Sequence, residues 1–301
     1  MQIFFLIMCL SLCLLTGCSK TTSTPQGKLP EEKVLKIGLV PEQDVFQEME
    51  RYQPLADYIS TKIGMKVNLK VLPAYGNIID NFLSLHLDGA FLGSFAYALA
   101  HSKLGLQVLA RPEYFDFLST YHGVIFVRRD SGIRAAKDMK GKRFVFVDKA
   151  TTAGYLLPLA YFKEHGINDY KGYFKESYFA GTHGNAIKDV LNGKADIGAA
   201  KNTVYERMAK TDSRITNDLI ILEASPDLPE NSLAVRKELS DSIKNKLKGV
   251  LLTMADDRDG RIVMKNFGAR RFIVTADEDY EPVYDYARKI GLNLATYDYE
   301  N

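Results

Sequence analysis

The sequence predicts an α/β protein built from two similar lobes. Strand-like and helix-like segments alternate along most of the 301 residues, which is the pattern of βαβ units with largely parallel strands. A set of residues in the first half also recurs in the second half at one fixed spacing. An apolar segment and a polar linker precede the first strand, so we expect the folded part to begin at residue 34.

The N-terminal segment has the features of an export signal. Residues 3–15 are almost continuously apolar, too short to span a membrane comfortably and typical of a signal-peptide core. They lead into Leu15-Thr16-Gly17-Cys18, which resembles the lipobox of bacterial lipoproteins, where cleavage precedes the cysteine and lipid is attached to its sulfur. We predict a lipoprotein signal peptide over 1–17 and a lipid anchor at Cys18. No Lys or Arg precedes the apolar run, and a short buried helix with incidental cysteines is the alternative.

A polar linker separates this anchor from the folded part. Residues 18–33 contain two prolines and show no apolar periodicity, so they are predicted to be a flexible tether. The folded part would then lie on the extracytoplasmic side of the membrane, anchored to the cell envelope. Cys9, Cys13 and Cys18 are the only cysteines, so no disulfide and no cysteine metal site is expected beyond them. The net charge of +2 and the lack of a basic run argue against a nucleic-acid partner.

The predicted elements follow one another as strand, helix and strand. Short apolar or alternating runs mark the strands, and longer runs with helical periodicity, several closed by glycine, mark the helices. Strands are expected at 34–40, 66–72, 89–93, 106–110, 122–129, 142–148, 177–179 and 195–199, and helices at 54–64, 77–87, 95–103 and 185–193, with a further helix that ends at Gly166.

The second half of the chain echoes the first at an offset of 108 residues (184 − 76). The matches fall at the turn before a helix, on its apolar face and at the turn into the next strand. They are Gly76/Gly184, Asn77/Asn185, Ile79/Ile187, Leu83/Leu191, Asp88/Asp196 and Tyr97/Tyr205. We therefore predict lobe 1 over 34–123 plus 224–301 and lobe 2 over 124–223, with a ligand cleft between them.

One turn of lobe 2 is suited to an oxyanion. Thr151, Thr152, Ala153 and Gly154 stand between an apolar strand and the start of a helix. The first N–H groups of a helix are unpaired and carry partial positive charge, so anions bind there readily. Threonine at such a position also caps the helix itself. The turn alone leaves both functions possible.

The echo places a second pair of residues at the cleft. Tyr75 precedes a helix in lobe 1, and His183 precedes the equivalent helix in lobe 2. A histidine there is either a ligand-binding residue or a capping residue, and the sequence leaves both open. The other histidines show no metal-binding spacing, and no nucleophile elbow, P-loop or dinucleotide motif occurs. We predict neither a metal site nor another cofactor, and we do not expect an enzyme.

Four segments of the chain resemble a known family. They are VLPAYGNIIDNFLSLHLDGAFLGSFAYA, STYHGVIFVRRDSGI, DMKGKRFVFVDKATTAGYLLP and AGTHGNAIKDVLNGKADIGA. In consistent order they are similar to the phosphonate-, phosphite- and phosphate-type periplasmic solute-binding proteins of ABC transporters. The resemblance implies a type II periplasmic-binding fold with two similar mixed-sheet lobes that close over a ligand. It also implies an ABC permease as partner and a monomeric binding protein.

The resemblance further implies a set of ligand-binding residues. Hydroxyls and amides of the turn would hold the oxygens of a small phosphorus oxyanion, and residues around the cleft would donate further hydrogen bonds. The set consists of Tyr75, Tyr121, Thr151, Thr152, Ala153, Gly154 and His183.

Two departures from the family pattern bear on the ligand. Ala153 replaces a third hydroxyl residue of the turn. Members that bind aminoalkyl phosphonates hold the ammonium with carboxylates, but 202–204 contains none and Asn231, next to Glu230, stands at the second position. We therefore expect phosphite, methylphosphonate or phosphate rather than an aminoethyl ligand. The alternative function is a sensor that reports the ligand to a membrane signalling partner.

Overall fold

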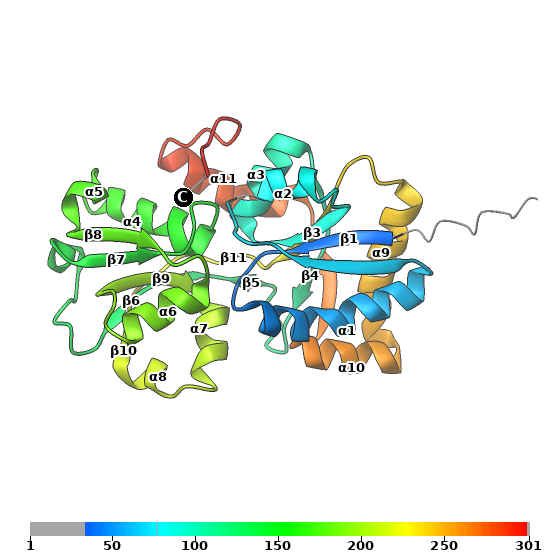
Figure 1. The fold of residues 1–301 in the computed structure, drawn as a ribbon, viewed down its shortest axis with the longest axis horizontal. Helices are drawn as coiled ribbons and strands as arrows, with labels where there is room; N and C mark the ends of the chain where they lie inside the picture. Colours follow the sequence, from blue (N-terminus) through cyan, green and yellow to red (C-terminus); the bar gives the residue numbers. More distant parts are fainter. Residues whose placement is uncertain (1–33, 77, 300–301) are drawn as a thin grey trace, which may run out of the picture. The chain divides into compact units, whose positions relative to one another are not determined.

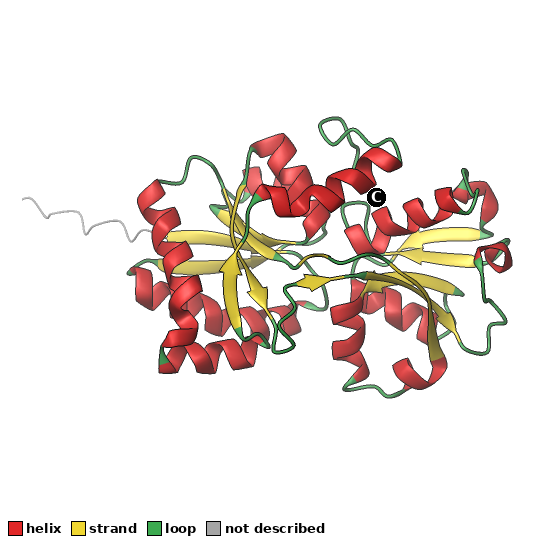
Figure 2. Cartoon of the chain, turned by 180° about the vertical axis from the view of Figure 1, so that it is seen from behind, coloured by secondary structure: helices red, strands yellow, loops and turns green. Residues whose placement is uncertain are grey.

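Two β-sheets, each with its own helices, organise the chain (Figure 1). The structure is a computed structural model that describes residues 34–76 and 78–299. The predicted signal peptide and the whole predicted tether, including Cys18, therefore lie outside the described residues, as does Asn77 of the echo. Helices cover both faces of each sheet (Figure 2). Within the described residues, no helix is long and apolar enough to cross a membrane.

All eight expected strands are present, but five further strands, one at residues 120–121 and four beyond residue 199, were not predicted. The strands are β1 (Val34–Leu39), β2 (Lys66–Val71), β3 (Gly89–Leu92), β4 (Gln107–Glu113), β5 (Thr120–Tyr121), β6 (Gly123–Arg128), β7 (Arg143–Phe146), β8 (Glu176–Phe179), β9 (Ile197–Lys201), β10 (Leu219–Ala224), β11 (Leu228–Pro229), β12 (Ser232–Val235) and β13 (Arg271–Val274).

The helices alternate with these strands. They are α1 (Val45–Ile63), α2 (Ile78–Ser84), α3 (Ser94–Leu104), α4 (Leu157–Glu164), α5 (Tyr170–Tyr173), α6 (His183–Leu191), α7 (Asn202–Ala209), α8 (Arg214–Asp218), α9 (Asp241–Thr253), α10 (Arg258–Phe267) and α11 (Glu281–Lys289), with short η turns at η1 (Ala136–Met139), η2 (Thr152–Leu156), η3 (Met254–Asp256) and η4 (Asp277–Tyr280).

The first helix is longer than the sequence suggested. We expected it to begin at Pro54, since proline is common in the first turn of a helix. Instead, α1 begins at Val45, and the Asp44 carboxylate caps it by accepting the N–H groups of Phe46 and Gln47. Pro54 lies inside α1, where burial of one face of the helix outweighs the hydrogen bond that proline cannot make.

The two sheets share one strand order, which explains the echo. The six-stranded sheet has the order β13-β4-β12-β3-β1-β2, and the five-stranded sheet has the order β10-β6-β9-β7-β8. In each, three parallel strands (β2-β1-β3 and β8-β7-β9) are followed by antiparallel strands. The sheets are therefore mixed, and parallel pairing, predicted for most strands, is confined to three neighbouring strands of each sheet.

One pair of echoing residues makes the same contacts in both sheets. The Asp88 carboxylate accepts the backbone N–H of Lys36 on β1 at 3.0 Å. The Asp196 carboxylate accepts the backbone N–H of Arg143 on β7 at 2.8 Å. Each aspartate thus ties the turn before the third parallel strand to the first strand of its sheet. The repeat in the sequence corresponds to a repeat of tertiary contacts.

The chain crosses between the sheets twice, and the two crossing segments pair with each other. The chain passes through β5 when it leaves the six-stranded sheet and through β11 when it returns to that sheet. These strands form a two-stranded antiparallel sheet with Tyr121 opposite Leu228. C-terminal residues contact both lobes, because Tyr297 donates to the Lys149 carbonyl and its ring packs on Phe95. The exact lobe boundaries stay a prediction.

Candidate functional site

The turn singled out in the sequence opens its helix with a wide π turn. Residues Thr152–Leu156 form η2, and α4 continues from it without a break. The N–H of Leu156 donates to the carbonyl of Thr151 at 3.1 Å, five residues back instead of four. A helix bonded in this way leaves one more N–H group at its start without a helical acceptor than an α-helix does. These N–H groups, including those of Ala153 and Gly154, begin at the carboxyl end of β7.

Gly154 is needed for packing rather than for ligand access. A Cβ atom at this position would lie 2.3 Å from the Cβ atom of Val147. The N–H of Val147 also donates to the Gly154 carbonyl at 3.1 Å. The absence of a side chain therefore lets the turn lie directly against the end of its strand.

The two threonine hydroxyls have different partners. Thr151 Oγ1 donates to the carbonyl of Asp148 at 2.6 Å, a local bond that stabilises the turn. Thr152 Oγ1 accepts the backbone N–H of Phe95 at 2.9 Å, across the boundary between the sheets. Phe95 lies in the first turn of α3, whose N-cap Gly93 supplies no side-chain cap. Thr152 thus joins the N-termini of two helices, one from each lobe, where their partial positive charges meet.

Tyr121 adjoins Thr152 at this junction. Its side chain is buried, and burial raises the pKa of the phenol, while the Lys201 ammonium and the hydroxyls of Ser94 and Thr152 act to lower it. The Ser94 hydroxyl itself donates to the carbonyl of Pro229 at 2.6 Å, which ties the start of α3 to β11. Tyr121 therefore stays protonated and lies among the hydroxyl groups of both lobes.

His183 and Tyr75 meet on the other side of the junction. Their rings pack edge to face with centroids 5.8 Å apart. His183 Nδ1 accepts the backbone N–H of Lys201 at 3.2 Å, so the ring proton is on Nε2. Burial, opposed by Glu42, lowers the pKa of His183 to about 3, so the ring is a neutral N–H donor.

Tyr75 carries a buried hydroxyl that has no hydrogen-bond partner within the described part of the chain. The side chain is only 3% exposed. Burial, with the carboxylates of Glu42 and Glu48 adding to it, raises the pKa of the phenol. A buried hydroxyl without a partner is costly, so this group is free to donate to a further acceptor.

All seven residues of the predicted set are buried, and the structure brings them to one junction. Contacts run from Phe95 to Thr152, from Tyr121 to Lys201, and from Lys201 through His183 to Tyr75. The residues involved lie at or after the ends of β2, β3, β7, β8 and β9, and ligands of α/β proteins bind at such carboxyl ends.

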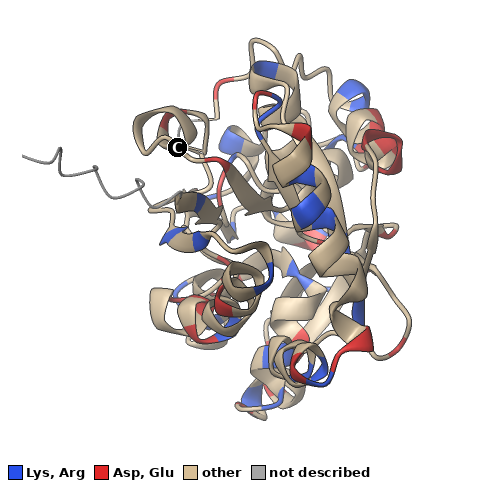
Figure 3. Cartoon of the chain, turned by 90° about the vertical axis from the view of Figure 1, so that its right-hand side faces the viewer, with Lys and Arg blue, Asp and Glu red and all other residues tan. Residues whose placement is uncertain are grey.

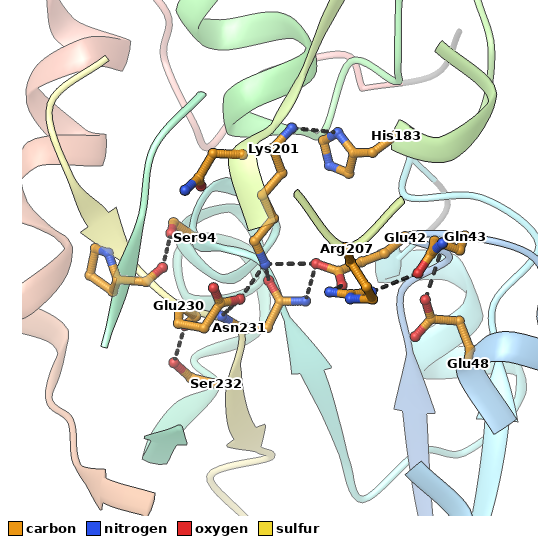
Figure 4. Close-up of polar contacts among 12 residues, drawn as sticks. Glu42, Gln43, Glu48, Ser94, His183, Lys201, Arg207, Glu230, Asn231 and Ser232 are labelled. Atoms are coloured by element: carbon orange, nitrogen blue, oxygen red, sulfur yellow. Dashed lines mark hydrogen bonds and ion pairs between the residues drawn. The ribbon is translucent and has the colours of Figure 1, made fainter. Parts of the chain in front are cut away.

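Sequence reasoning missed a buried ion cluster at the same junction (Figure 4). The ammonium of Lys201, at the end of β9, donates to Glu42 Oε1 at 2.7 Å and to Asn231 Oδ1 at 3.0 Å. It also donates to Glu230 Oε1. Burial acts to lower the pKa of Lys201, but the Glu230 and Glu42 carboxylates raise it above its usual value. Lys201 is therefore a permanent cation among residues of lobe 1.

Further charges surround Glu42. Arg51 lies 3.4 Å and Arg207 lies 3.7 Å from its second oxygen, Oε2. Burial works to raise the pKa of Glu42, but Lys201 and the two arginines outweigh it and lower the pKa. Burial and the neighbouring Glu42 raise the pKa of Glu48 to about 7.

The signal for Lys201 in the sequence was weak. The predicted strand ended at residue 199, two residues before Lys201. Its partner Glu42 lies 159 residues away, so no local pattern connects them. Elsewhere Lys and Arg mix with Asp and Glu on the same helices (Figure 3). Within 34–76 and 78–299, no group of His, Cys, Asp and Glu could hold a metal ion.

The chemistry of the junction is that of small-anion binding. It offers neutral donors from His183 and Tyr75, N–H groups at the start of a helix, and hydroxyls shared between the lobes. Buried charge-assisted and helix-terminal hydrogen bonds hold oxyanions without requiring a metal.

Comparison with known proteins identifies the family of the chain. Residues 37–280 match the family described as "ABC transporter, phosphonate, periplasmic substrate-binding protein". The phosphonates-binding periplasmic protein of Escherichia coli (strain K12) is 25% identical over 272 residues, 89% of this chain and 80% of that protein. A probable ABC transporter phosphite binding protein of Prochlorococcus marinus (strain MIT 9301) is 23% identical over 272 residues, 86% of this chain and 90% of that protein.

A solved structure shares the fold. The Prochlorococcus marinus protein in complex with methylphosphonate has a TM-score of 0.76 at 23% identity, covering 86% of this chain and 99% of that chain. The fold is thus of the type II periplasmic-binding class, as predicted. The matched family consists of substrate-binding transport proteins, not enzymes. With the match extending over both sheets, the chain belongs to the periplasmic substrate-binding proteins of phosphonate ABC transporters.

Proposed function

We propose that this protein is a lipid-anchored binding protein that captures a small phosphorus oxyanion between its lobes and delivers it to an ABC permease. The ligand is phosphite, methylphosphonate or phosphate. The names of the relatives support this class, since they include a phosphonates-binding and a phosphite binding protein.

The observation that carries the proposal is the buried hydroxyl of Tyr75 beside the N–H of His183 Nε2. Neither group is ionised, and the Tyr75 hydroxyl has no hydrogen-bond partner in the described chain. Phosphorus oxyanions present three or four oxygens, which need several donors from different directions. The N–H groups of Ala153 and Gly154 supply donors from lobe 2, and Tyr75 supplies one from lobe 1.

Closure follows from this division of the donors. An oxyanion held at the turn of lobe 2 reaches the Tyr75 hydroxyl only when the lobes meet. The closed state therefore gains contacts that the open state lacks, and the ligand shifts the equilibrium toward it. The Phe95 N–H to Thr152 bond forms in the same closed state.

A thermal-shift screen of the full-length protein in mild detergent tests the ligand class. The panel contains phosphite, phosphate, methylphosphonate, 2-aminoethylphosphonate, sulfate and selenite. A ligand present at 100 times its Kd stabilises the folded state by about 2.7 kcal/mol. We expect the largest shift from one of the first three compounds. A shift from another ligand class without any shift from a phosphorus oxyanion contradicts the proposal.

The anchor is tested separately. We expect the protein in the membrane fraction, and we expect Cys18→Ser to release it because the lipid-bearing sulfur is gone. Wild-type protein found in the aqueous fraction would exclude the lipid anchor without affecting the ligand proposal. We also expect the bound ligand to be recovered chemically unchanged. Each protein monomer is expected to bind one ligand molecule.

A further inference from the structure

The ammonium of Lys201 is enclosed by a complete set of ammonium-binding groups. Glu42 Oε1, Glu230 Oε1 and Asn231 Oδ1 each accept one hydrogen bond from it. An ammonium has three N–H donors, so these three acceptors match it. The ring of Tyr121 adds a cation–π contact at 4.6 Å. The Lys201 side chain is 3% exposed, and those of Glu42 and Glu230 are 2% exposed.

This ammonium box, formed by Glu42, Glu230, Asn231 and Tyr121, adjoins the proposed oxyanion site. Tyr121 belongs to both, since its ring faces Lys201 and its phenol interacts with Thr152. The backbone N–H of Lys201 also holds His183 in its donor tautomer. Tyr121 therefore connects the box with the turn. A ligand with an oxyanion at the turn and an ammonium on a short tail would place its ammonium at this box.

We propose that Lys201 is a resident ammonium that sets ligand selectivity by filling the box in which the ammonium of an aminoalkyl phosphonate would otherwise bind. The inference rests on the proposed function. From the sequence, an aminoethyl ligand was not expected because carboxylates were missing at two positions. The structure gives a different reason. Carboxylates are present at the junction, in Glu42 and Glu230, but the protein's own cation already occupies them.

The surrounding charges strengthen the exclusion. Lys201, Arg51 and Arg207 face the carboxylates of Glu42 and Glu230. The carboxylates of the cluster are thus already neutralised by the protein's own cations. The ammonium of a ligand would be a further cation close to that of Lys201. Like charges repel strongly at short range in a buried site. An oxyanion without a cationic tail meets no such repulsion.

The wild-type protein provides the first test. Calorimetric titration of the full-length protein should give a Kd for 2-aminoethylphosphonate at least ten times the Kd for methylphosphonate. Equal affinities, or tighter binding of the aminoethyl compound, would overturn the inference and leave the proposed function standing. Binding of no phosphorus oxyanion at all would refute the proposed function itself, and the inference with it.

Lys201→Met provides the second test, since it keeps the apolar length of the side chain and removes the ammonium. The ratio of the two Kd values, aminoethyl to methyl compound, should fall at least tenfold, because the ligand's ammonium then replaces the missing one. Lys194→Met is the matched control, an exposed lysine of the same lobe paired with Asp189. The ratio should stay at the wild-type value in this control.

A double variant keeps the test decisive if Lys201→Met unfolds. Lys201→Met/Glu230→Gln removes one cation and one anion together, so no extra buried charge is left unpaired. Its Kd ratio should still fall below the wild-type value because the resident ammonium is gone. An unchanged ratio in a folded variant, single or double, would show that Lys201 has only a structural role.

Discussion

Substitution of Thr152 best distinguishes a ligand-binding role of the turn from a role in helix capping alone. Its hydroxyl oxygen accepts the N–H of Phe95 from the other lobe at 2.9 Å, and both residues are buried. In the proposed complex the same hydroxyl lies at the oxyanion. Thr152→Val preserves the shape of the side chain and removes the hydroxyl group. The closed, liganded state then loses a contact between the lobes and a contact to the ligand.

The structure sets the size of the expected effect. A buried N–H left without its acceptor costs about 1–3 kcal/mol, and a hydrogen bond to a charged group contributes about 1.5–3 kcal/mol. The two terms share one hydroxyl and are not additive, so we expect ligand affinity to weaken by about 1–3 kcal/mol. This corresponds to an increase in Kd of about 5- to 150-fold.

Calorimetric titration with the best ligand of the screen measures this change. Thr152→Ser retains the hydroxyl and is the matched control, with an expected Kd within a few-fold of the wild type. Thr151→Val gives a further comparison, because that hydroxyl already donates to Asp148 and its loss should lower thermal stability first. The reasoning fails if Thr152→Val lowers the melting temperature and leaves the Kd unchanged. That result would restore the plain capping interpretation.

Three further predictions follow from burial and packing. Tyr75→Phe removes a buried hydroxyl without a protein partner, so we expect unchanged or higher thermal stability but weaker ligand binding by titration; weakened folding with intact binding would contradict this. The pKa of Glu48 is raised from 4.5 to about 7, so folding takes up a proton and its stabilising contribution is lost as pH rises from 4.5 through 7. Glu48→Gln should therefore stabilise the protein at pH 8 by on the order of 2–3 kcal/mol and much less at pH 4.5, measured by denaturant unfolding; an equal gain at both pH values would exclude a proton-linked effect. Gly154→Ala places a methyl group 2.3 Å from the Cβ atom of Val147 and should destabilise by about 1–3 kcal/mol or more, whereas Gly249→Ala, in a helix with open space around it, should not destabilise. Equal melting temperatures for these two variants would show that the Thr151–Gly154 turn accommodates the added methyl group without loss of stability.

Much of the fold could be predicted from the sequence because its signals are local. Apolar runs placed the strands β1–β4 and β6–β9 but not β5 or those after residue 201, and the fixed spacing between Asp88 and Asp196 indicated the repeated lobe. Both aspartates accept a backbone N–H from the first strand of their sheet. The same tertiary contact is thus made in both lobes, and its aspartate appears twice in the sequence. The start of α1 was missed because Pro54 is the stronger local signal, although Asp44 caps the helix ten residues before the expected start.

The site could be predicted only in part, for a physical reason. The Thr151–Gly154 turn is contiguous in sequence and carries its own helix, so its chemistry can be recognised there. The contact between Thr152 and Phe95 and the ion cluster at Lys201 depend on segments brought together by the sheets. The π turn also has no distinct residue pattern, because Gly154 owes its place to packing against Val147.

In the proposed opening of the lobes, we expect the paired strands β5 and β11, where the chain crosses between the sheets, to form a corner of the site that moves little. Tyr121 lies on one of them, and Glu230 directly follows the other. Atoms near the axis of a rotation are displaced less than atoms far from it, so these residues keep their mutual positions when the lobes open. Tyr75, Thr152 and His183 lie on the parts that separate. A ligand arriving in the open protein would thus meet a preformed corner first, and the time that it stays would be set by the contacts that close over it afterwards.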